Sequence, residues 1–573
     1  MKKLHGRVGG LAAIVGGVTL AAGAAAQLRD VTQNPDIAGV PGHPGDSAGI
    51  NISYDAQKGA SPNDHGSVDL VGSSAFIIAR DPARAVRRGR QLFQRKFQIA
   101  QGNGPTTDDG IGSSGADVSR SAGFADSCAA CHGRPRGSAG FGGDVATRPD
   151  SRDAPHLFGL GLQEMLADEI TTELRSIRAE ALTIAQLINT PVTRVLTAKN
   201  LNFGSIVANP NGTFDVSGVQ GINGDLRVRP FFFQGGTVSI REFLVGAFNA
   251  EMGLESPDID LINAQTNSVV TPAGMVLDGR IDFVENAPVQ SPTVDGDGDG
   301  VVNEIPVSIV DFMEFYLLNY FKPALGKPSE EATLGRILFT QVGCTSCHVP
   351  NLTIDRDRRV ADVETVHNPT SGNPLNNMFA TATVLAVNDP EIPAILNPDG
   401  STQQPAGLMP AGNSFVVRNF FADFKRHDLG PNFHERNYAN FVAQVSGFGP
   451  GPGAPLPVEP PPTPPLNFVT QHITEPLWGV GDTPPYGHDG RSGTLLDVIL
   501  RHGGEAQAAR AAFVALPANA QNWLITFLRS LVLFGPDDTA SNLLPKNTEA
   551  AGFPQVGHGA IALSAIFRTP GPE

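Results

Sequence analysis

Two copies of the sequence C-x-x-C-H constrain this chain more than any other feature. The copies are Cys128, Cys131 and His132, and Cys344, Cys347 and His348. They use all four cysteines of the 573 residues. This pattern attaches a c-type haem, because two thioether bonds need thiols one helical turn apart and the neighbouring imidazole ligates the iron. The sequence therefore predicts two covalently bound haems, with His132 and His348 as iron ligands.

Paired cysteines also serve two other chemistries. Two disulfides are the ordinary expectation for four cysteines in an oxidising compartment. A C-x-x-C pair is also half of a four-cysteine zinc site. Neither chemistry requires a histidine directly after each pair. We therefore favour haem and keep zinc as the alternative.

The N-terminus has the pattern of a secretory signal. Lys2, Lys3 and Arg7 precede an apolar run over residues 8–22, and small residues at 24–26 offer a cleavage site. A membrane anchor is the less favoured interpretation, because the run is short and rich in Gly and Ala. No later stretch reaches the roughly 18 apolar residues at which a spanning helix becomes plausible. We expect a periplasmic protein without a membrane span once the signal is removed.

The charge balance bears on partners. The formal net charge is −16, and the chain has no Lys/Arg-rich run. The long-range field therefore repels nucleic acid and anionic lipid, and it favours small basic partners. We expect no nucleic-acid partner.

A second repeat supports two equivalent halves. The sequence G-R-x-L-F occurs ahead of each haem motif, at Gly89–Phe93 and at Gly335–Phe339. Apolar residues at three and four spacing predict helices over 154–176, 238–252, 307–321, 494–501 and 518–534. We predict a mainly α fold of two cytochrome c-like helical domains, each wrapped on one covalent haem, with long irregular insertions.

The domain boundaries follow from composition and from the repeats. We predict a signal peptide at 1–26, an irregular N-terminal arm at 27–80, an N-terminal c-type haem domain at 81–325, a C-terminal c-type haem domain at 326–540 with a Pro/Gly-rich insertion at 447–465, and a C-terminal tail at 541–573.

Several short sequences outside the haem motifs resemble bacterial di-haem cytochrome c peroxidases and MauG-like enzymes, most closely their di-haem oxidoreductase branch. These sequences are Pro476–Gly479, Pro485–Arg491, Thr494–Leu495, His502–Glu505, Gly159–Glu164, Ala247–Gly253 and His427–Gly430. With long insertions they cover roughly residues 85–535. The resemblance implies an enzyme that reduces hydrogen peroxide at the N-terminal haem. Electrons would come through the C-terminal haem from a small redox protein, a cytochrome c or a cupredoxin.

The resemblance also suggests residues beyond the attachment motifs. Family peroxidases have a Met, and MauG-like members a Tyr, 14 residues after the signature histidine; here His488 leads to His502. His502 would then ligate the C-terminal haem opposite His348, and imidazole in place of thioether should lower the reduction potential. A helix-end histidine favoured by the dipole is the alternative.

The N-terminal haem has two candidate catalytic residues by the same resemblance. Glu251, in the pair Glu251-Met252, matches the family's distal glutamate and would pass a proton to and from hydrogen peroxide. Arg241 stands where the family has Gln and would stabilise developing negative charge. A surface arginine is the alternative for Arg241. His156 and His427 are further histidines that would be able to cap the N-terminal iron at rest.

Two features are left with two interpretations each. Asp295, Asp297 and Asp299, with Gly300 and Asn303, match a calcium loop whose twelfth position is Pro306 instead of Glu, so weak calcium binding and a solvated acidic turn both fit. Residues 231–233 are three Phe where the family often has a Trp between the haems, and ordinary core packing is the other interpretation.

Two further functions fit the same motifs. A non-catalytic dihaem electron-transfer cytochrome needs two axial ligands on each iron. A dihaem dioxygenase would use dioxygen on an organic substrate. Both stay alternatives to the peroxidase.

Overall fold

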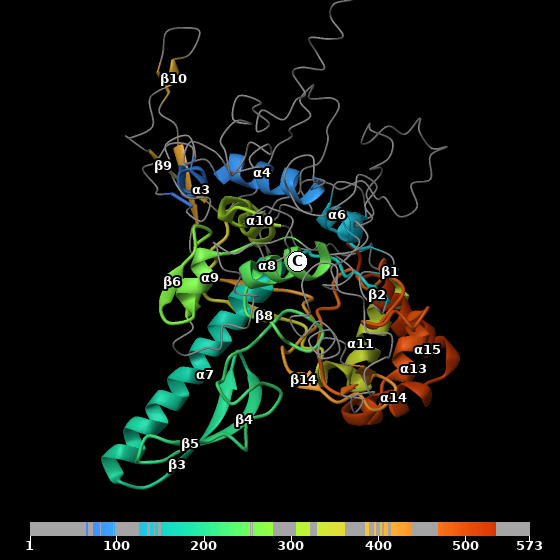
Figure 1. Cartoon of the computed structure of the whole chain (residues 1–573). Coiled ribbons are helices and arrows are strands. Elements are labelled where there is room, and N and C mark those ends of the chain that lie inside the picture. Colours follow the sequence, from blue (N-terminus) through green and yellow to red (C-terminus); the bar gives the residue numbers. More distant parts are fainter. Residues whose placement is uncertain are drawn as a thin grey trace, which may run out of the picture.

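A computed structural model describes the larger part of the chain (Figure 1). The described residues are 65–66, 73–80, 82–95, 97, 125, 127–134, 138–142, 144–146, 151–252, 254, 256–278, 305–320, 329–360, 384–388, 395–396, 402–403, 406–410, 414–436 and 468–533. The helices are α3 (Ser74–Arg80), α4 (Pro82–Gln94), α6 (Cys128–His132), α7 (Leu160–Ile188), α8 (Ile240–Met252), α9 (Ile259–Ala264), α10 (Val307–Asn319), α11 (Glu330–Gln341), α13 (Leu495–Arg501), α14 (Gln507–Val514) and α15 (Ala518–Arg529), with 3₁₀ turns η4 (Cys344–Ser346) and η6 (Gly504–Ala506).

The strands are short and pair in small antiparallel sheets. They are β1 (Asp144–Ala146) with β2 (Ser151–Asp153), β3 (Val192–Ala198) with β4 (Leu201–Ala208) and β5 (Phe214–Asp215), β6 (Ser268–Val270) with β7 (Val276–Asp278), β8 (Leu352–Ile354) with β13 (Phe415–Val417), β9 (Val384–Asn388) with β12 (Ala406–Pro410), β10 (Ile395–Leu396) with β11 (Thr402–Gln403), β14 (Arg426–His427) with β17 (His472–Ile473), and β15 (Glu435–Arg436) with β16 (Phe468–Val469).

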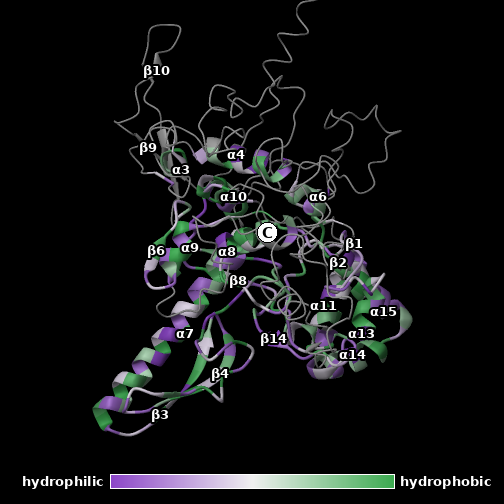
Figure 2. Cartoon of the chain, viewed as in Figure 1, coloured by the Kyte–Doolittle hydropathy of each residue, from purple (hydrophilic) through white to green (hydrophobic). Residues whose placement is uncertain are grey.

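Helix α10 lies at the centre of the larger core. All its residues are buried, and it packs against α4 on one side and α8 on the other (Figures 1 and 2). A methyl group at Gly89 of α4 would lie only 2.1 Å from the carbonyl oxygen of Phe312. The first G-R-x-L-F repeat therefore places a glycine where α4 and α10 approach closely.

Helices α11 and α15 repeat this arrangement in the C-terminal half. A methyl group at Gly335 of α11 would lie 1.9 Å from the carbonyl oxygen of Trp523 on α15. Phe93 and Phe339, the last residues of the two repeats, are both buried. The G-R-x-L-F repeat therefore specifies a close helix crossing ahead of each C-x-x-C-H motif.

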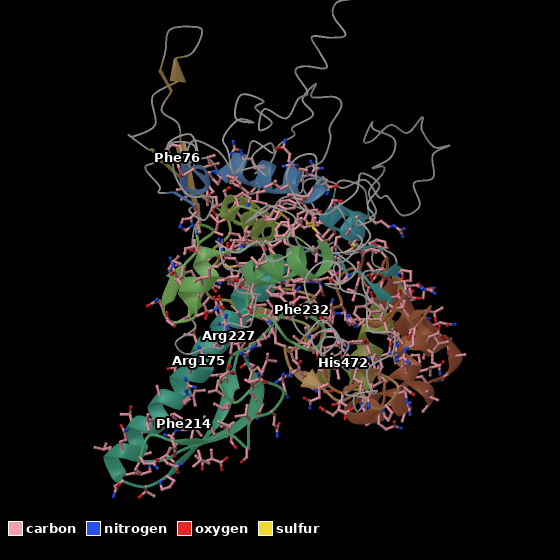
Figure 3. All side chains as sticks on the ribbon, in the orientation of Figure 1. Phe76, Arg175, Phe214, Arg227, Phe232 and His472 are labelled. Atoms are coloured by element: carbon pink, nitrogen blue, oxygen red, sulfur yellow. The ribbon has the colours of Figure 1, made fainter. Side chains whose placement is uncertain are left out.

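A long arm projects from the body of the molecule. It consists of the C-terminal part of α7 and the sheet β3–β4–β5, with Phe214 near its middle (Figures 1 and 3). The guanidinium of Arg178 on α7 lies over the Phe214 ring, 5.6 Å from its centroid. Lys199 and Asn200 between β3 and β4 both have positive φ, the conformation of a two-residue hairpin turn that matches strand twist.

Among the described residues, the buried apolar side chains form one large core and two smaller ones. The large core takes residues from both halves of the chain, from Ile77 to Leu533, and includes Phe420 and Trp478. A smaller core surrounds α11 and α15 and includes Phe339 and Phe421. The third lies in the projecting arm, where Ala181 and Ala185 of α7 are buried together with Val192 and Ala208 of β3 and β4.

The prediction of a mainly α fold of two cytochrome c-like helical domains is wrong for the described residues. They are 43% helix and 15% strand, and the strands form several small sheets. The largest sheet was missed because the search for apolar residues three and four positions apart finds only helices. It does not detect the alternating β-branched residues of Val192–Ala198 or the turn at Lys199. The predicted helices themselves are confirmed as α7, α8, α10, α13 and α15, although α7 begins later and runs further than expected.

Other predictions fall partly or wholly outside the described residues. The signal peptide, most of the N-terminal arm, the insertion at 447–465 and the tail at 541–573 lie there, as do Asp295, Asp297 and Asp299. The domain boundaries therefore stay a prediction. Within the described part of the chain, no helix combines the length and the apolar character needed to cross a membrane.

Candidate functional site

The first C-x-x-C-H motif forms the short helix α6. Ser127 caps the helix by accepting a hydrogen bond from the backbone N of Ala130 at 3.2 Å. Cys128 and Cys131 lie one turn apart on this helix, and neither forms a disulfide. Burial raises the pKa of the Cys128 thiol to about 12, so the sulfur is an uncharged thiol at neutral pH.

The histidine of the first motif is held as a neutral ring. Nδ1 of His132 lies 2.7 Å from the carbonyl oxygen of Pro155. A carbonyl can only accept, so Nδ1 carries the proton and Nε2 keeps its lone pair. Burial lowers the pKa of His132. This is the donor that a haem iron needs, and the Pro155 carbonyl already holds the ring in this tautomer.

The second motif has the same arrangement on a different local backbone. Cys344 begins the 3₁₀ turn η4, and neither Cys344 nor Cys347 forms a disulfide. Nδ1 of His348 donates to the carbonyl oxygen of Phe421 at 3.0 Å. Burial lowers the pKa of His348 to about 4. The residues therefore fit a haem at this site in the same way as at the first.

His502 lies close to His348. It follows α13, and its Nδ1 donates to the carbonyl oxygen of Val498 at 2.7 Å. Burial lowers the pKa of His502, and electrostatic interaction with His502 contributes to the low pKa of His348. His502 is thus at a helix end, as the dipole interpretation supposed, but its ring is neutral and presents Nε2. That His502 ligates the C-terminal haem, as the family resemblance implies, stays a prediction.

An ion-pair cluster orients the helix that ends at His502. Asp489 accepts a hydrogen bond from Nη1 of Arg501 at 2.9 Å. Burial alone would raise the pKa of Asp489, but the hydrogen bonds from Arg501 and Arg491 lower it. The guanidinium of Arg501 lies over the ring of Phe433, 4.3 Å from its centroid, and this ring packs edge-on against His502. The H-D-G-R sequence therefore holds His502 in place.

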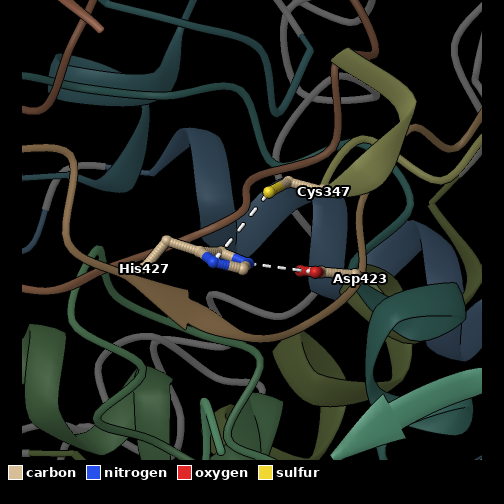
Figure 4. A group of neighbouring side chains, drawn as sticks. All are labelled: Cys347, Asp423 and His427. Carbon is tan, nitrogen blue, oxygen red and sulfur yellow. Dashed lines mark hydrogen bonds and ion pairs between the residues drawn. The ribbon is translucent and has the colours of Figure 1, made fainter. Parts of the chain in front are cut away.

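A charged histidine lies beside Cys347. Nε2 of His427 lies 3.0 Å from Asp423, and its Nδ1 lies 3.9 Å from the Cys347 sulfur (Figure 4). The same Nδ1 lies 2.7 Å from Glu505. Burial lowers the pKa of His427, but the two carboxylates and Cys347 raise it to about 11. The ring is therefore an imidazolium at the second motif. Among the described residues His427 lies there and not at the first motif, where it was weighed as a cap.

The two carboxylate partners of His427 were missed from the sequence. Glu505 belongs to H-G-G-E and His427 to H-D-L-G, so the family-like pieces contained both residues. Asp423 had no such signal. Their pairing depends on β14 meeting η6 across a long separation in sequence, which local spacing does not encode.

Glu251 is a candidate proton carrier near the first motif. Glu251 lies in the last turn of α8 and is partly buried. Its charge raises the pKa of His132 and partly opposes the effect of burial, so the two residues are electrostatic neighbours. The described structure therefore brings Glu251 toward the first motif, and its catalytic role stays a prediction.

Arg241 is buried in a cluster of acidic residues. Its side chain is 0% exposed, which excludes the surface interpretation. The guanidinium donates to Asp258, Asp311 and Glu314, each at 2.8 Å. These ion pairs account for the burial of Arg241, and they occupy the donors that the catalytic interpretation would use.

The three Phe residues at 231–233 lie between the halves of the chain. Phe233 stacks on His488 with 3.8 Å between ring centroids and also contacts His472 at 5.3 Å. His472 lies on the side of the C-terminal elements, below Phe232 (Figure 3). Glu435 lies 2.7 Å from Nδ1 of His488. The signature histidine is thus held between a carboxylate and a ring from the N-terminal half.

Two neutral histidines beside paired thiols, each braced by a backbone carbonyl, define the donor set of a haem-binding redox protein. Residues 469–531 match the model of the family described as "Di-haem oxidoreductase, putative peroxidase". The match contains P-L-W-G, H-D-G-R and His502, and it confirms the resemblance to the di-haem peroxidase-like branch. The family implies haem binding and supports oxidoreductase activity. No curated protein and no solved structure matches the chain.

Proposed function

We propose that this protein is a periplasmic di-haem c-type oxidoreductase that reduces hydrogen peroxide at its N-terminal haem. The observation that supports this most is that His132, His348 and His502 are held in the same tautomer. Each ring donates from Nδ1 to a backbone carbonyl, so each keeps a free lone pair on Nε2. Bound haem would supply the redox chemistry, held by thioether bonds to Cys128 and Cys131 and to Cys344 and Cys347.

The residues around the two motifs would do different work. Glu251 would take the proton from hydrogen peroxide and return it to the departing oxygen. His348 and His502 would hold the C-terminal haem through their imidazole nitrogens, and a small basic redox protein would supply the electrons. The net charge of −16 favours such a donor at a distance.

Haem content tests the first half of the proposal. The full chain, exported and purified, should keep its haem absorbance after denaturation and acid extraction, and its mass should exceed that of the polypeptide by two haems. Replacing both thiols of one motif, as in C128S/C131S, should remove one haem and leave the other. The matched variant C344S/C347S should give the same loss at the second motif. Free thiols or bound zinc in the wild type would disprove covalent haem.

Activity tests the second half. After reductive activation, one haem should become high-spin, and peroxide should drive oxidation of a reduced cytochrome c or cupredoxin. Two haems that stay six-coordinate and low-spin, without peroxide-driven turnover, would instead indicate an electron-transfer cytochrome. A stable dioxygen adduct without peroxide activity would indicate a dioxygenase.

A further inference from the structure

A second polar site lies inside the N-terminal half, away from the two C-x-x-C-H motifs. Four buried carboxylates surround the Arg241 guanidinium: Asp258, Asp260, Asp311 and Glu314. Arg241 alone does not balance four acidic groups. Buried carboxylates with excess negative charge must gain protons or a cation.

His65 completes one side of this cluster. Its Nδ1 lies 3.8 Å from Oδ2 of Asp260 and 4.0 Å from Oδ2 of Asp311. Both distances are too long for a hydrogen bond. They are close to the separation of roughly 3–4 Å expected between donor atoms that share one ion at about 2.0–2.2 Å. The three atoms therefore converge without bonding one another.

Two of these atoms are also unsatisfied. Asp260 is only 3% exposed, and its Oδ2 makes no hydrogen bond among the described residues, although Nη2 of Arg241 lies 3.4 Å away. Nδ1 of His65 is buried and likewise makes none in the described part of the chain. The third atom, Oδ2 of Asp311, accepts a hydrogen bond from Ser74, and an oxygen can still use its other lone pair. Buried polar atoms left in this way call for an explanation.

We propose that His65, Asp260 and Asp311 bind a divalent transition-metal ion, of which zinc is the simplest probe. One imidazole nitrogen and two carboxylate oxygens form a donor set that suits zinc or manganese better than calcium, which prefers oxygen alone. The added charge would balance the acidic residues that Arg241 leaves uncompensated. None of the three residues belongs to the acidic sequence at 295–303.

The ion would join three separate segments. Asp260 lies on α9, Asp311 lies on α10, and His65 precedes α3. The backbone of His65 is already tied to α3, because its carbonyl accepts hydrogen bonds from Ser74 and from the backbone N of Ala75, both at 3.2 Å. A bound ion would therefore fix the chain ahead of α3 to the core of the N-terminal half, and it would stabilise the folded state by mass action.

Calorimetry with zinc alone tests this proposal on the haem-loaded full chain after treatment with a chelator. We expect one zinc per chain, confirmed by elemental analysis and counted separately from haem iron, together with a rise in the thermal unfolding midpoint. H65A and D260N should lose both effects. H434A is the matched control, because His434 has the same exposed fraction as His65, 24%, and also pairs with an aspartate.

Two results would overturn the proposal. One is a wild type that binds no zinc, which would leave His65 as an imidazolium paired with the carboxylates. The other is zinc binding that H65A retains in full, which would place the ion elsewhere. Circular dichroism and haem content show whether each variant is folded. If D260N fails to fold, H65A alone decides, since its side chain lies at the partly exposed edge of the cluster.

Discussion

His156 donates a hydrogen bond from Nε2 to the carbonyl oxygen of Trp478, with 2.7 Å between the two atoms. Its Nδ1 accepts from the backbone N of Phe158 at 3.2 Å, so both ring nitrogens are engaged and the ring is not available as an iron cap in this conformation. The Trp478 ring packs edge-on against Phe420 with centroids 5.1 Å apart. The segment beside the first motif is thereby tied to the family signature in the C-terminal half.

The first prediction concerns acid stability at this contact. Burial, as the largest effect, lowers the pKa of His156 to about 4. Between about pH 6.5 and 4 the unfolded chain binds a proton at this ring and the folded chain does not, so the free energy of unfolding falls as pH falls. H156Q should make that fall shallower, by up to about 1.4 kcal/mol per pH unit. Urea unfolding at pH 7 and pH 5 measures this difference.

H434Q is the control for the acid prediction, because His434 is a partly exposed ring in an ion pair with Asp428. An equal change of slope in H434Q would show that the effect is not specific to the buried ring of His156. If wild type and H156Q lose the same amount of stability on acidification, His156 is not a neutral buried ring.

His502 carries the second prediction. A thioether ligand favours the reduced iron more than an imidazole does, so H502M should raise the reduction potential of the C-terminal haem and leave the other potential unchanged. Spectroelectrochemical titration of the purified protein measures both potentials. If wild type and H502M have equal reduction potentials and intact haem content, His502 is a helix-end residue without a role at the iron.

Glu251 carries the third prediction. A residue that moves protons during the reaction typically contributes a factor of about 10²–10⁴, so E251Q should lower kcat for peroxide reduction by that order while both haems stay attached. E180Q is the control, because Glu180 is a 64% exposed carboxylate on α7. Wild-type turnover in E251Q would show that Glu251 does not transfer protons in the reaction.

Local sequence patterns predicted the helices better than they predicted the contacts around the two motifs. The two motifs, the helices with three and four spacing and the G-R-x-L-F repeat each depend on residues close together in the chain, and the structure has the helices and the repeat where they were expected. The acceptors for His132 and His348 are the backbone carbonyls of Pro155 and Phe421. Any residue type supplies a carbonyl, so no sequence pattern could identify these partners.

The sequence also could not predict ion pairs between residues that lie far apart in the chain. Arg241 is a catalytic candidate from the sequence because it stands where the family has Gln, with a surface arginine as the alternative. Its partner Glu314 comes from a later segment that the packing of α8 on α10 brings near, and its partner Asp258 caps α9. The β3–β4 hairpin was missed for a different reason, since the turn at Lys199-Asn200 lacks the glycine that usually indicates one.

His427 carries the fourth prediction, on alkaline stability. Its raised pKa of about 11 means that the folded ring keeps its proton after the unfolded ring has lost it above about pH 6.5. The stabilisation is therefore complete below about pH 6.5 and is lost as the pH rises toward 11. Removing one partner of a buried charge pair costs about 3 kcal/mol, so H427Q should lower the free energy of unfolding by this order at neutral pH.

The double variant H427Q/D423N is the control for this prediction. Because His427 and Asp423 share one interaction, the losses of the two single variants should add to more than the loss of the double variant. Two results would show that the ring is not held as an imidazolium. One is that the losses in free energy of unfolding are additive, and the other is that the difference in stability between wild type and H427Q persists unchanged at pH 11.

The last prediction tests the close helix crossing of the C-terminal half. A methyl group at Gly335 would meet the carbonyl of Trp523 at 1.9 Å, and backbone cannot move aside as a flexible side chain can. G335A should therefore cost about 1–3 kcal/mol through overpacking. Gly246 on α8 is the matched helical control, since no atom of the described residues lies within 4 Å of its added methyl group; G246A should stabilise the chain by about 0.5–1 kcal/mol. Denaturant unfolding of both variants measures the contrast, and similar effects of the two substitutions would mean that α11 and α15 do not cross at this glycine.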